Sequence, residues 1–139
     1  MLPQTARITC LDRFEGVSDG QALLDRFEAN IARTGAAEKV QKIAGNPCDE
    51  LRSLSHYSYQ FLYVGGMKTA SETLEIAVLS WGLLTVGSLI VFEDYGVNTP
   101  QNTTQLFPKG SIDAFITLFE TKIKRLHQGS VLLLEKLAD

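Results

Sequence analysis

The sequence predicts an α/β fold with a mainly parallel sheet, and three adjacent segments carry this prediction. Residues 59–64 (YQFLYV) and 89–92 (LIVF) are short apolar runs, and a helical pattern occupies residues 69–84 between them. Strand, helix and strand in this order form one βαβ unit. Strands that are apolar almost throughout are typical of parallel sheets covered on both faces.

The two apolar runs end in residues suited to a ligand site. The first ends at Gly65 and Gly66, and the second ends at Glu93 and Asp94. Ligands of open parallel sheets bind beyond the carboxyl ends of the strands. These four residues therefore mark the edge at which we expect a site.

The segment before this unit predicts a second strand–helix–strand arrangement. Residues 7–11 are β-branched and apolar and end at Asp12. A helical face then follows, Gly35 is suited to end that helix, and residues 40–45 predict a further short strand. The helical face is formed by Leu23, Leu24, Phe27 and Ile31.

The segment after Asp94 predicts a loop, a helix and a hairpin. Residues 96–105 are polar, and residues 108–121 carry apolar side chains at helical spacing. Residues 123–127 and 131–135 flank a Gln-Gly-Ser turn, which indicates an antiparallel hairpin.

Length, charge and cysteine content narrow the kinds of protein this chain can be. A chain of 139 residues suits one domain, 1–139, and its net charge of −3 argues against a nucleic-acid partner. No apolar run approaches the roughly 20 residues that span a membrane. Two cysteines, Cys10 and Cys48, form no disulfide framework, which fits a cytoplasmic location.

Four strings resemble the class I S-adenosylmethionine-dependent methyltransferases, above all the macrocin-type sugar O-methyltransferases. They cover nearly the whole chain: ARITCLDRFEG, RFEANIARTGAAEKVQKIAGN, YQFLYVGGMKTASETLEIAVLSWGLLTVGSLIVFEDYG and KGSIDAFITLFETKIKRLHQGSVLLLEK. The resemblance implies a Rossmann-like sandwich with a C-terminal antiparallel hairpin and a transferase that uses S-adenosylmethionine.

The resemblance also implies roles for single residues. Asp12 would bind the ribose hydroxyls of the cofactor, and Gly65 and Gly66 would lie in a cofactor-binding turn. Glu93 and Asp94 would bind a divalent metal such as magnesium or activate a hydroxyl acceptor. Lys68 would replace a catalytic histidine, and Tyr95 would line the substrate cleft.

Two departures from the family pattern concern catalysis. The match begins at the family's second strand, so the first strand and helix with their glycine-rich turn are missing, and no G-x-G-x-G-like string occurs. Gly65 stands where metal-using relatives have an aspartate ligand. We therefore expect impaired or absent cofactor binding and an incomplete metal site.

Three functions stay open. The chain is an O-methyltransferase acting on a small hydroxyl acceptor, an inert truncated remnant used for binding or assembly, or a different enzyme or nucleoside binder built on the half-site that remains. Each candidate side chain also has an ordinary interpretation. Asp12, for example, can be a solvated strand-end acid, and Glu93 and Asp94 can be acids left beside a former site.

The missing strand would leave the edges of 7–11 and 59–64 unpaired, which is unfavourable. Either these edges pair with each other or a second chain covers them. We expect a homodimer with a closed sheet.

Overall fold

A computed structural model describes residues 5–15, 20–66, 69–96 and 108–139. The chain divides into two compact units, Met1–Glu50 and Leu51–Asp139, and each is treated by itself. The expectation of one domain over 1–139 therefore stays a prediction. Among the described helices, none has the length and apolarity that crossing a membrane requires.

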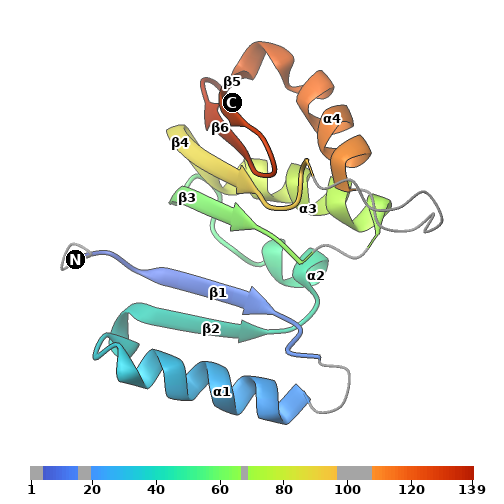
Figure 1. The fold of residues 1–139 in the computed structure, drawn as a ribbon. Helices are drawn as coiled ribbons and strands as arrows, with labels where there is room; N and C mark the ends of the chain where they lie inside the picture. Colours follow the sequence, from blue (N-terminus) through green and yellow to red (C-terminus); the bar gives the residue numbers. More distant parts are fainter. Residues whose placement is uncertain (1–4, 16–19, 67–68, 97–107) are drawn as a thin grey trace. The chain divides into compact units, whose positions relative to one another are not determined.

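The first unit is a parallel strand pair with one long helix. Strand β1 (Ile8–Asp12) pairs in parallel with β2 (Val40–Ala44), in a register that places Ile8 opposite Val40. Helix α1 (Gly20–Arg33) and a 3-10 turn (Ala37–Lys39) connect them (Figure 1). Gly35 follows α1 with φ +66°, the left-handed conformation that ends many helices. The strand–helix–strand prediction for this segment is confirmed.

The second unit contains a four-stranded sheet of order β3-β4-β6-β5 (Figure 1). Strands β3 (Tyr59–Val64) and β4 (Leu84–Phe92) are parallel. Strands β5 (Ile123–Gln128) and β6 (Leu132–Lys136) form the predicted hairpin, and β6 runs antiparallel to β4. The predicted α/β class, with its parallel strands and C-terminal antiparallel hairpin, is confirmed.

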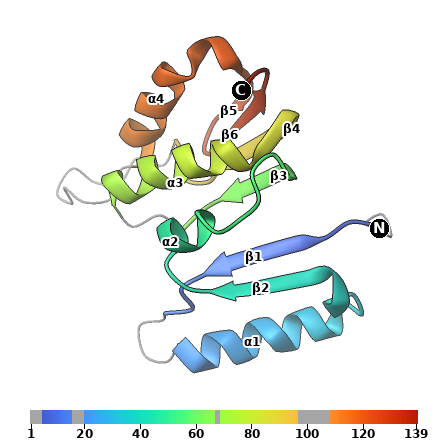
Figure 2. The same ribbon diagram turned by 180° about the vertical axis from the view of Figure 1, so that it is seen from behind.

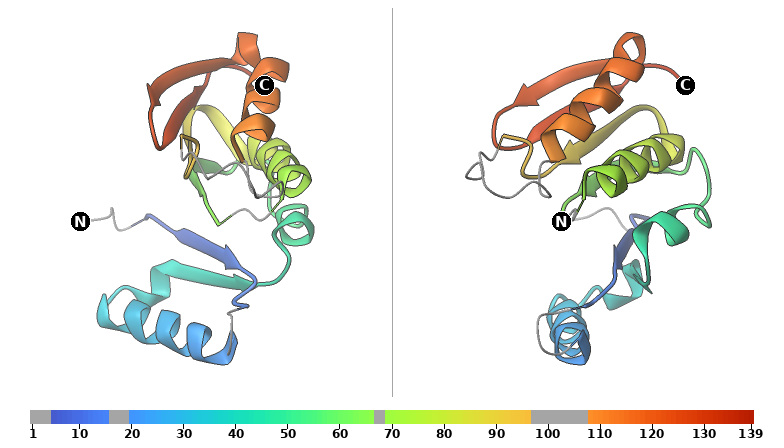
Figure 3. Two further views of the ribbon diagram at one scale, coloured as in Figure 1. Left: turned by 45° about the vertical axis from the view of Figure 1, so that its right-hand side comes forward. Right: turned by 90° about the vertical axis from the view of Figure 1, so that its right-hand side faces the viewer.

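Two helices cover one face of this sheet. Helices α3 (Ala70–Leu83) and α4 (Pro108–Leu118) lie side by side on that face, as Figures 2 and 3 show. Alternate residues of the strands point towards them and are buried: Val64, Ile90, Phe92, Leu132 and Leu134. Phe115 of α4 packs against Trp81 and Phe92 with ring centroids 5.7 and 5.8 Å apart. This cluster is the core of the second unit.

Both ends of α3 are fixed by side chains. At the start, the Thr69 hydroxyl accepts a hydrogen bond from the backbone N–H of Glu72, at 3.2 Å. At the end, the ammonium of Lys136 donates to the carbonyl oxygens of Trp81 and Leu84, at 3.2 and 2.9 Å. A cation placed at the carbonyl end of a helix also interacts favourably with the helix dipole.

The structure differs from the sequence prediction in two element bounds. Strand β4 begins at Leu84 instead of residue 89, because the segment after α3 continues as extended chain around Gly87, which has φ +83°. Helix α4 ends at Leu118, and a 3-10 turn (Glu120–Lys122) takes up the rest of the predicted helix. A short helix, α2 (Pro47–Leu51), lies between β2 and β3 in the chain.

Strand β1 is hydrogen-bonded to β2, and β3 is hydrogen-bonded to β4. The expected pairing of the strand at 7–11 with the strand at 59–64 would join the two units and stays a prediction. The other alternative, cover by a second chain, stays open.

Candidate functional site at the carboxyl ends of β3 and β4

The parallel register of β3 and β4 brings their carboxyl ends together. Val64 pairs with Phe92, and the backbone N–H of Glu93 donates to the carbonyl oxygen of Val64 at 2.9 Å. Gly65 and Glu93 are consequently neighbours at one edge of the sheet. Two of the predicted site residues thus meet, although they are 28 positions apart in sequence.

The Glu93 side chain lies over the backbone of Gly65. A Cβ atom at Gly65 would be 3.4 Å from both the Cβ and the Cδ of Glu93, and it would overlap one carboxylate oxygen. The absence of a side chain at Gly65 therefore leaves the space that this carboxylate occupies. An aspartate at the same position would require the Glu93 carboxylate to move.

Tyr63 belongs to the same cluster, and sequence reasoning did not select it. Hydrogen bonding to Glu93 is the main cause that raises the pKa of the Tyr63 phenol, with smaller effects from desolvation and from the charges of Glu93 and Asp94. The pKa of Tyr63 rises because the neutral phenol donates to the carboxylate, whereas a phenolate would be repelled by it. The sequence held no signal for this contact, because it depends on the register that pairs Tyr63 with Val91, two positions before Glu93.

Asp94 and Gly66 form the turns that follow the two strands. Both have left-handed backbones, with φ +58° at Asp94 and +67° at Gly66. Aspartate is one of the few side chains that tolerate this region. Asp94 is exposed, so its carboxylate stands in solvent next to the cluster.

The donor set does not fit a divalent metal. Within the part of the chain that the structure describes, no three His, Cys, Asp or Glu side chains are grouped so as to hold an ion. Glu93 and Asp94 are two acids, and Gly65 contributes no side-chain oxygen. Hard cations of this kind bind through six or more oxygen atoms, of which carboxylates supply the charge. We therefore derive no catalytic step through a metal.

Tyr95, the predicted substrate contact, is buried and faces α4. Its side chain is 3% exposed, and its hydroxyl donates to Asp113 at 2.6 Å. Lys109 donates to the same hydroxyl at 3.3 Å and lies 4.8 Å from the centroid of the Tyr95 ring. These contacts attach the segment after β4 to α4, and the substrate role of Tyr95 stays a prediction.

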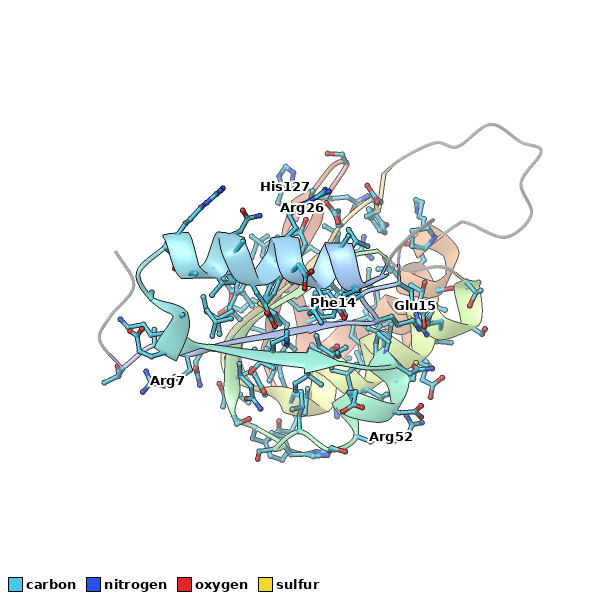
Figure 4. All side chains as sticks on the ribbon, turned by 90° about the horizontal axis from the view of Figure 1, so that it is seen from below. Arg7, Phe14, Glu15, Arg26, Arg52 and His127 are labelled. Carbon is cyan, nitrogen blue, oxygen red and sulfur yellow. The ribbon has the colours of Figure 1, made fainter. Side chains whose placement is uncertain are left out.

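Asp12 lies in the first unit, at the carboxyl end of β1. Its Oδ1 accepts a hydrogen bond from the backbone N–H of Phe14 at 2.7 Å, and its side chain is exposed. Phe14 has φ +53° and packs edge-on against Phe27 of α1, with ring centroids 5.3 Å apart (Figure 4). The turn after β1 is therefore fixed, and the carboxylate at its start has a defined position.

The remaining predicted site residue, Lys68, lies outside the described residues. The structure thus brings Gly65, Glu93 and Asp94 together and adds Tyr63 to them. It places Tyr95 under α4 and Asp12 in the first unit. The ligand roles of these residues stay predictions.

The comparisons with known proteins agree with this arrangement of elements. No protein-family model matches the chain, and no curated protein matches it either. Solved structures do match over almost its full length. The O-methyltransferase TomG from Streptomyces achromogenes, solved with S-adenosylmethionine, has a TM-score of 0.74 at 14% identity. The match covers 99% of this chain and 65% of that chain.

Two further structures give the same result. A protein from Corynebacterium glutamicum has a TM-score of 0.69 at 20% identity, covering 99% of this chain and 64% of the other. The O-methyltransferase from Bacillus cereus, solved with S-adenosylhomocysteine, has a TM-score of 0.66 at 16% identity, covering 94% and 63%. The chain shares the Rossmann-like α/β fold of these structures. It spans slightly less than two thirds of the length of these structures.

Proposed function

We propose that this chain is an S-adenosylmethionine-dependent O-methyltransferase-like protein in which cofactor binding is impaired. The observation that supports the proposal is the end-to-end likeness of its fold to O-methyltransferases solved with that cofactor or its product. The acids at the ends of β1 and β4 have the chemistry that such a reaction needs. The acceptor we propose is a small molecule with a hydroxyl group.

Asp12 is the residue we assign to the cofactor. A carboxylate accepts up to four hydrogen bonds, so the one from Phe14 leaves capacity for the two hydroxyls of a ribose. The same hydrogen bond fixes the direction of the carboxylate, which lowers the entropy lost on binding. When bound, S-adenosylmethionine supplies an electrophilic methyl group.

Glu93 is the residue we assign to the acceptor. A hydroxyl becomes a better nucleophile when a carboxylate accepts its proton, and Glu93 is held at the sheet edge by its packing over Gly65. The Tyr63 phenol, whose pKa the Glu93 carboxylate raises, is the residue we assign to position this carboxylate. This assignment requires neither Lys68 nor a metal ion.

We expect impaired cofactor binding because the chain lacks a glycine-rich turn. Backbone approach to a nucleotide cofactor uses a glycine-rich turn, and this chain contains no G-x-G string. Gly65 and Gly66 are adjacent and do not have the spacing of such a string. We therefore expect the dissociation constant to lie above the micromolar range.

A thermal-shift titration tests the proposal. S-adenosylmethionine and S-adenosylhomocysteine are added up to millimolar concentration, with and without magnesium, to the wild type, Asp12→Ala and Asp25→Ala. Asp25 is an exposed acid of α1 and is the matched control. We expect a small rise in Tm at millimolar ligand that Asp12→Ala loses and Asp25→Ala keeps. A rise that Asp12→Ala retains in full would refute the role of Asp12.

A second candidate is a catalytically inert remnant that acts in binding or assembly. One observation favours it: β3 carries two large aromatic side chains, Phe61 and Tyr63, that are 54% and 58% exposed, and exposed apolar side chains that lie together are typical of binding surfaces. The absence of any thermal shift at millimolar ligand would support this candidate over the first.

A further inference from the structure

The turn after β4, residues 93–96, is anchored at both ends by backbone hydrogen bonds. The N–H of Glu93 donates to the carbonyl oxygen of Val64 in β3 at 2.9 Å. At the other end, the N–H of Gly96 donates to the carbonyl oxygen of Ser130, in the turn between β5 and β6, at 3.2 Å. A Cβ atom at Gly96 would be 2.2 Å from the backbone oxygen of the residue before Ser130. Position 96 therefore needs a glycine, because a backbone atom cannot move aside as a side chain can.

The middle of the same turn is anchored by the side chain of Tyr95. This side chain is 3% exposed, and its hydroxyl donates to Oδ1 of Asp113 in α4 at 2.6 Å. Lys109, one helical turn earlier in α4, donates to the Tyr95 hydroxyl and to Oδ2 of the same carboxylate. The hydroxyl thus both donates and accepts a hydrogen bond, which fixes the direction of the Tyr95 side chain.

Helix α4 is itself attached to the segment that follows β3. Ser111, two residues before Asp113, is 8% exposed, and its hydroxyl donates to the carbonyl oxygen of Ala70 at 2.7 Å. Ala70 is the first residue of α3, the helix after β3. Asp113 therefore has a fixed place relative to the chain after both strands of the candidate site. Its partner Tyr95 is two residues from Glu93.

We propose that Asp113 is a positioning residue of the candidate site and acts through its hydrogen bond with Tyr95. This bond fixes the middle of the turn, and the turn sets the direction in which the Glu93 carboxylate points. Neither Asp113 nor Tyr95 needs to touch a ligand for this role. The inference rests on the proposed function, in which Glu93 accepts the proton of the acceptor hydroxyl. A carboxylate in that role must lie within hydrogen-bond reach of the hydroxyl, so its direction matters for the reaction.

The ionisation of Tyr63 reports the position of the Glu93 carboxylate, because that carboxylate raises the pKa of the Tyr63 phenol. The tyrosines are labelled with carbon-13 at Cζ and titrated by NMR, and Tyr63→Phe identifies the Tyr63 signal. We expect Tyr95→Phe and Asp113→Ala both to lower the pKa of Tyr63 towards the ordinary value of about 10. Asp113→Asn is the matched control, because it loses the charge but keeps an oxygen that accepts from Tyr95. This variant should keep the raised pKa of Tyr63.

A double substitution tests whether Tyr95 acts through Glu93. Glu93→Gln should lower the pKa of Tyr63, and Tyr95→Phe added to Glu93→Gln should lower it no further, because the carboxylate that the turn positions is then absent. Circular dichroism should show that every variant is folded.

Three results would overturn the proposal. The first is a folded Tyr95→Phe variant in which the pKa of Tyr63 is not lowered. The second is an equal lowering by Tyr95→Phe with and without the Glu93 carboxylate, and the third is an equal lowering by Asp113→Asn and Asp113→Ala. The titrations contain neither cofactor nor acceptor, so their outcome is separate from that of the thermal-shift test of the proposed function.

Discussion

The carboxylate of Glu93 lies over Gly65, in the space that a side chain at this position would need. This relationship connects two residues that the sequence had marked separately, each at the end of a strand. It also explains why the donor set does not fit a metal. Gly65 is the position from which a third acid would come, and the Glu93 carboxylate occupies the space that its side chain would need. The site in the described residues is therefore a carboxylate next to a phenol, and a metal cluster is not formed there.

Gly65→Asp should convert this cluster into a cation site. The new acid displaces the flexible end of Glu93 and makes three carboxylates with Asp94, the charge that a hard cation needs. Terbium luminescence excited through Tyr63 measures the binding. We expect at least about tenfold tighter binding than the wild type, since each added carboxylate ligand strengthens a hard-cation site. Gly65→Asn is the control of equal size, and equal binding by this variant would refute the account.

The sequence predicted the elements of the fold well, because their signals are local. The β3 bounds and the C-terminal hairpin follow from apolar runs and turn residues alone. The sequence did not predict Tyr63 as a partner of Glu93, because that contact depends on the register between two strands.

Lys136 should be the most important charged residue for the stability of the second unit. Its side chain is 1% exposed, its ammonium donates to Trp81 and Leu84, and it forms an ion pair with Asp139 at 2.7 Å. Lys136→Met removes the ammonium donor from both carbonyl oxygens, although the Trp81 oxygen still accepts from the backbone N–H of Leu84. We expect a loss of about 2–4 kcal/mol in the free energy of unfolding.

Urea unfolding followed by the fluorescence of the single tryptophan, Trp81, measures this loss, because Trp81 is 5% exposed when folded. Lys124→Met is the control. Lys124 pairs with Glu135 at 3.8 Å on the surface and should contribute less than about 1 kcal/mol. Equal losses in the two variants would contradict the importance of the buried position.

The Tyr95–Asp113–Lys109 contacts should make stability depend on pH at the acidic end. Burial would raise the pKa of Asp113, but hydrogen bonds from Lys109 and Tyr95 outweigh it and hold that pKa below its ordinary value. The charged form of Asp113 is therefore favoured by folding. Its stabilisation is fully present above the unfolded pKa of about 4 and is lost as the pH falls through the folded pKa.

Asp113→Asn tests this pH dependence, because asparagine keeps the shape and the acceptor for Tyr95 but loses the charge. We expect the wild type to have the higher Tm at pH 7 and the difference to disappear below about pH 3. Because Asp113 is 42% exposed in its side chain, solvent screening keeps the effect to about 1 kcal/mol or less. A Tm difference that stays constant from pH 7 to pH 2 would show that the charge is not the cause.

The most direct test of the proposed function is a calorimetric titration of the 139-residue chain with S-adenosylhomocysteine, the product of methyl transfer. The acids Asp12 and Glu93 are present, but the chain has no G-x-G string. We predict no saturable binding at micromolar ligand, with any heat confined to the millimolar range. A dissociation constant in the micromolar range would contradict the account, because the chain would then hold the cofactor without a glycine-rich turn.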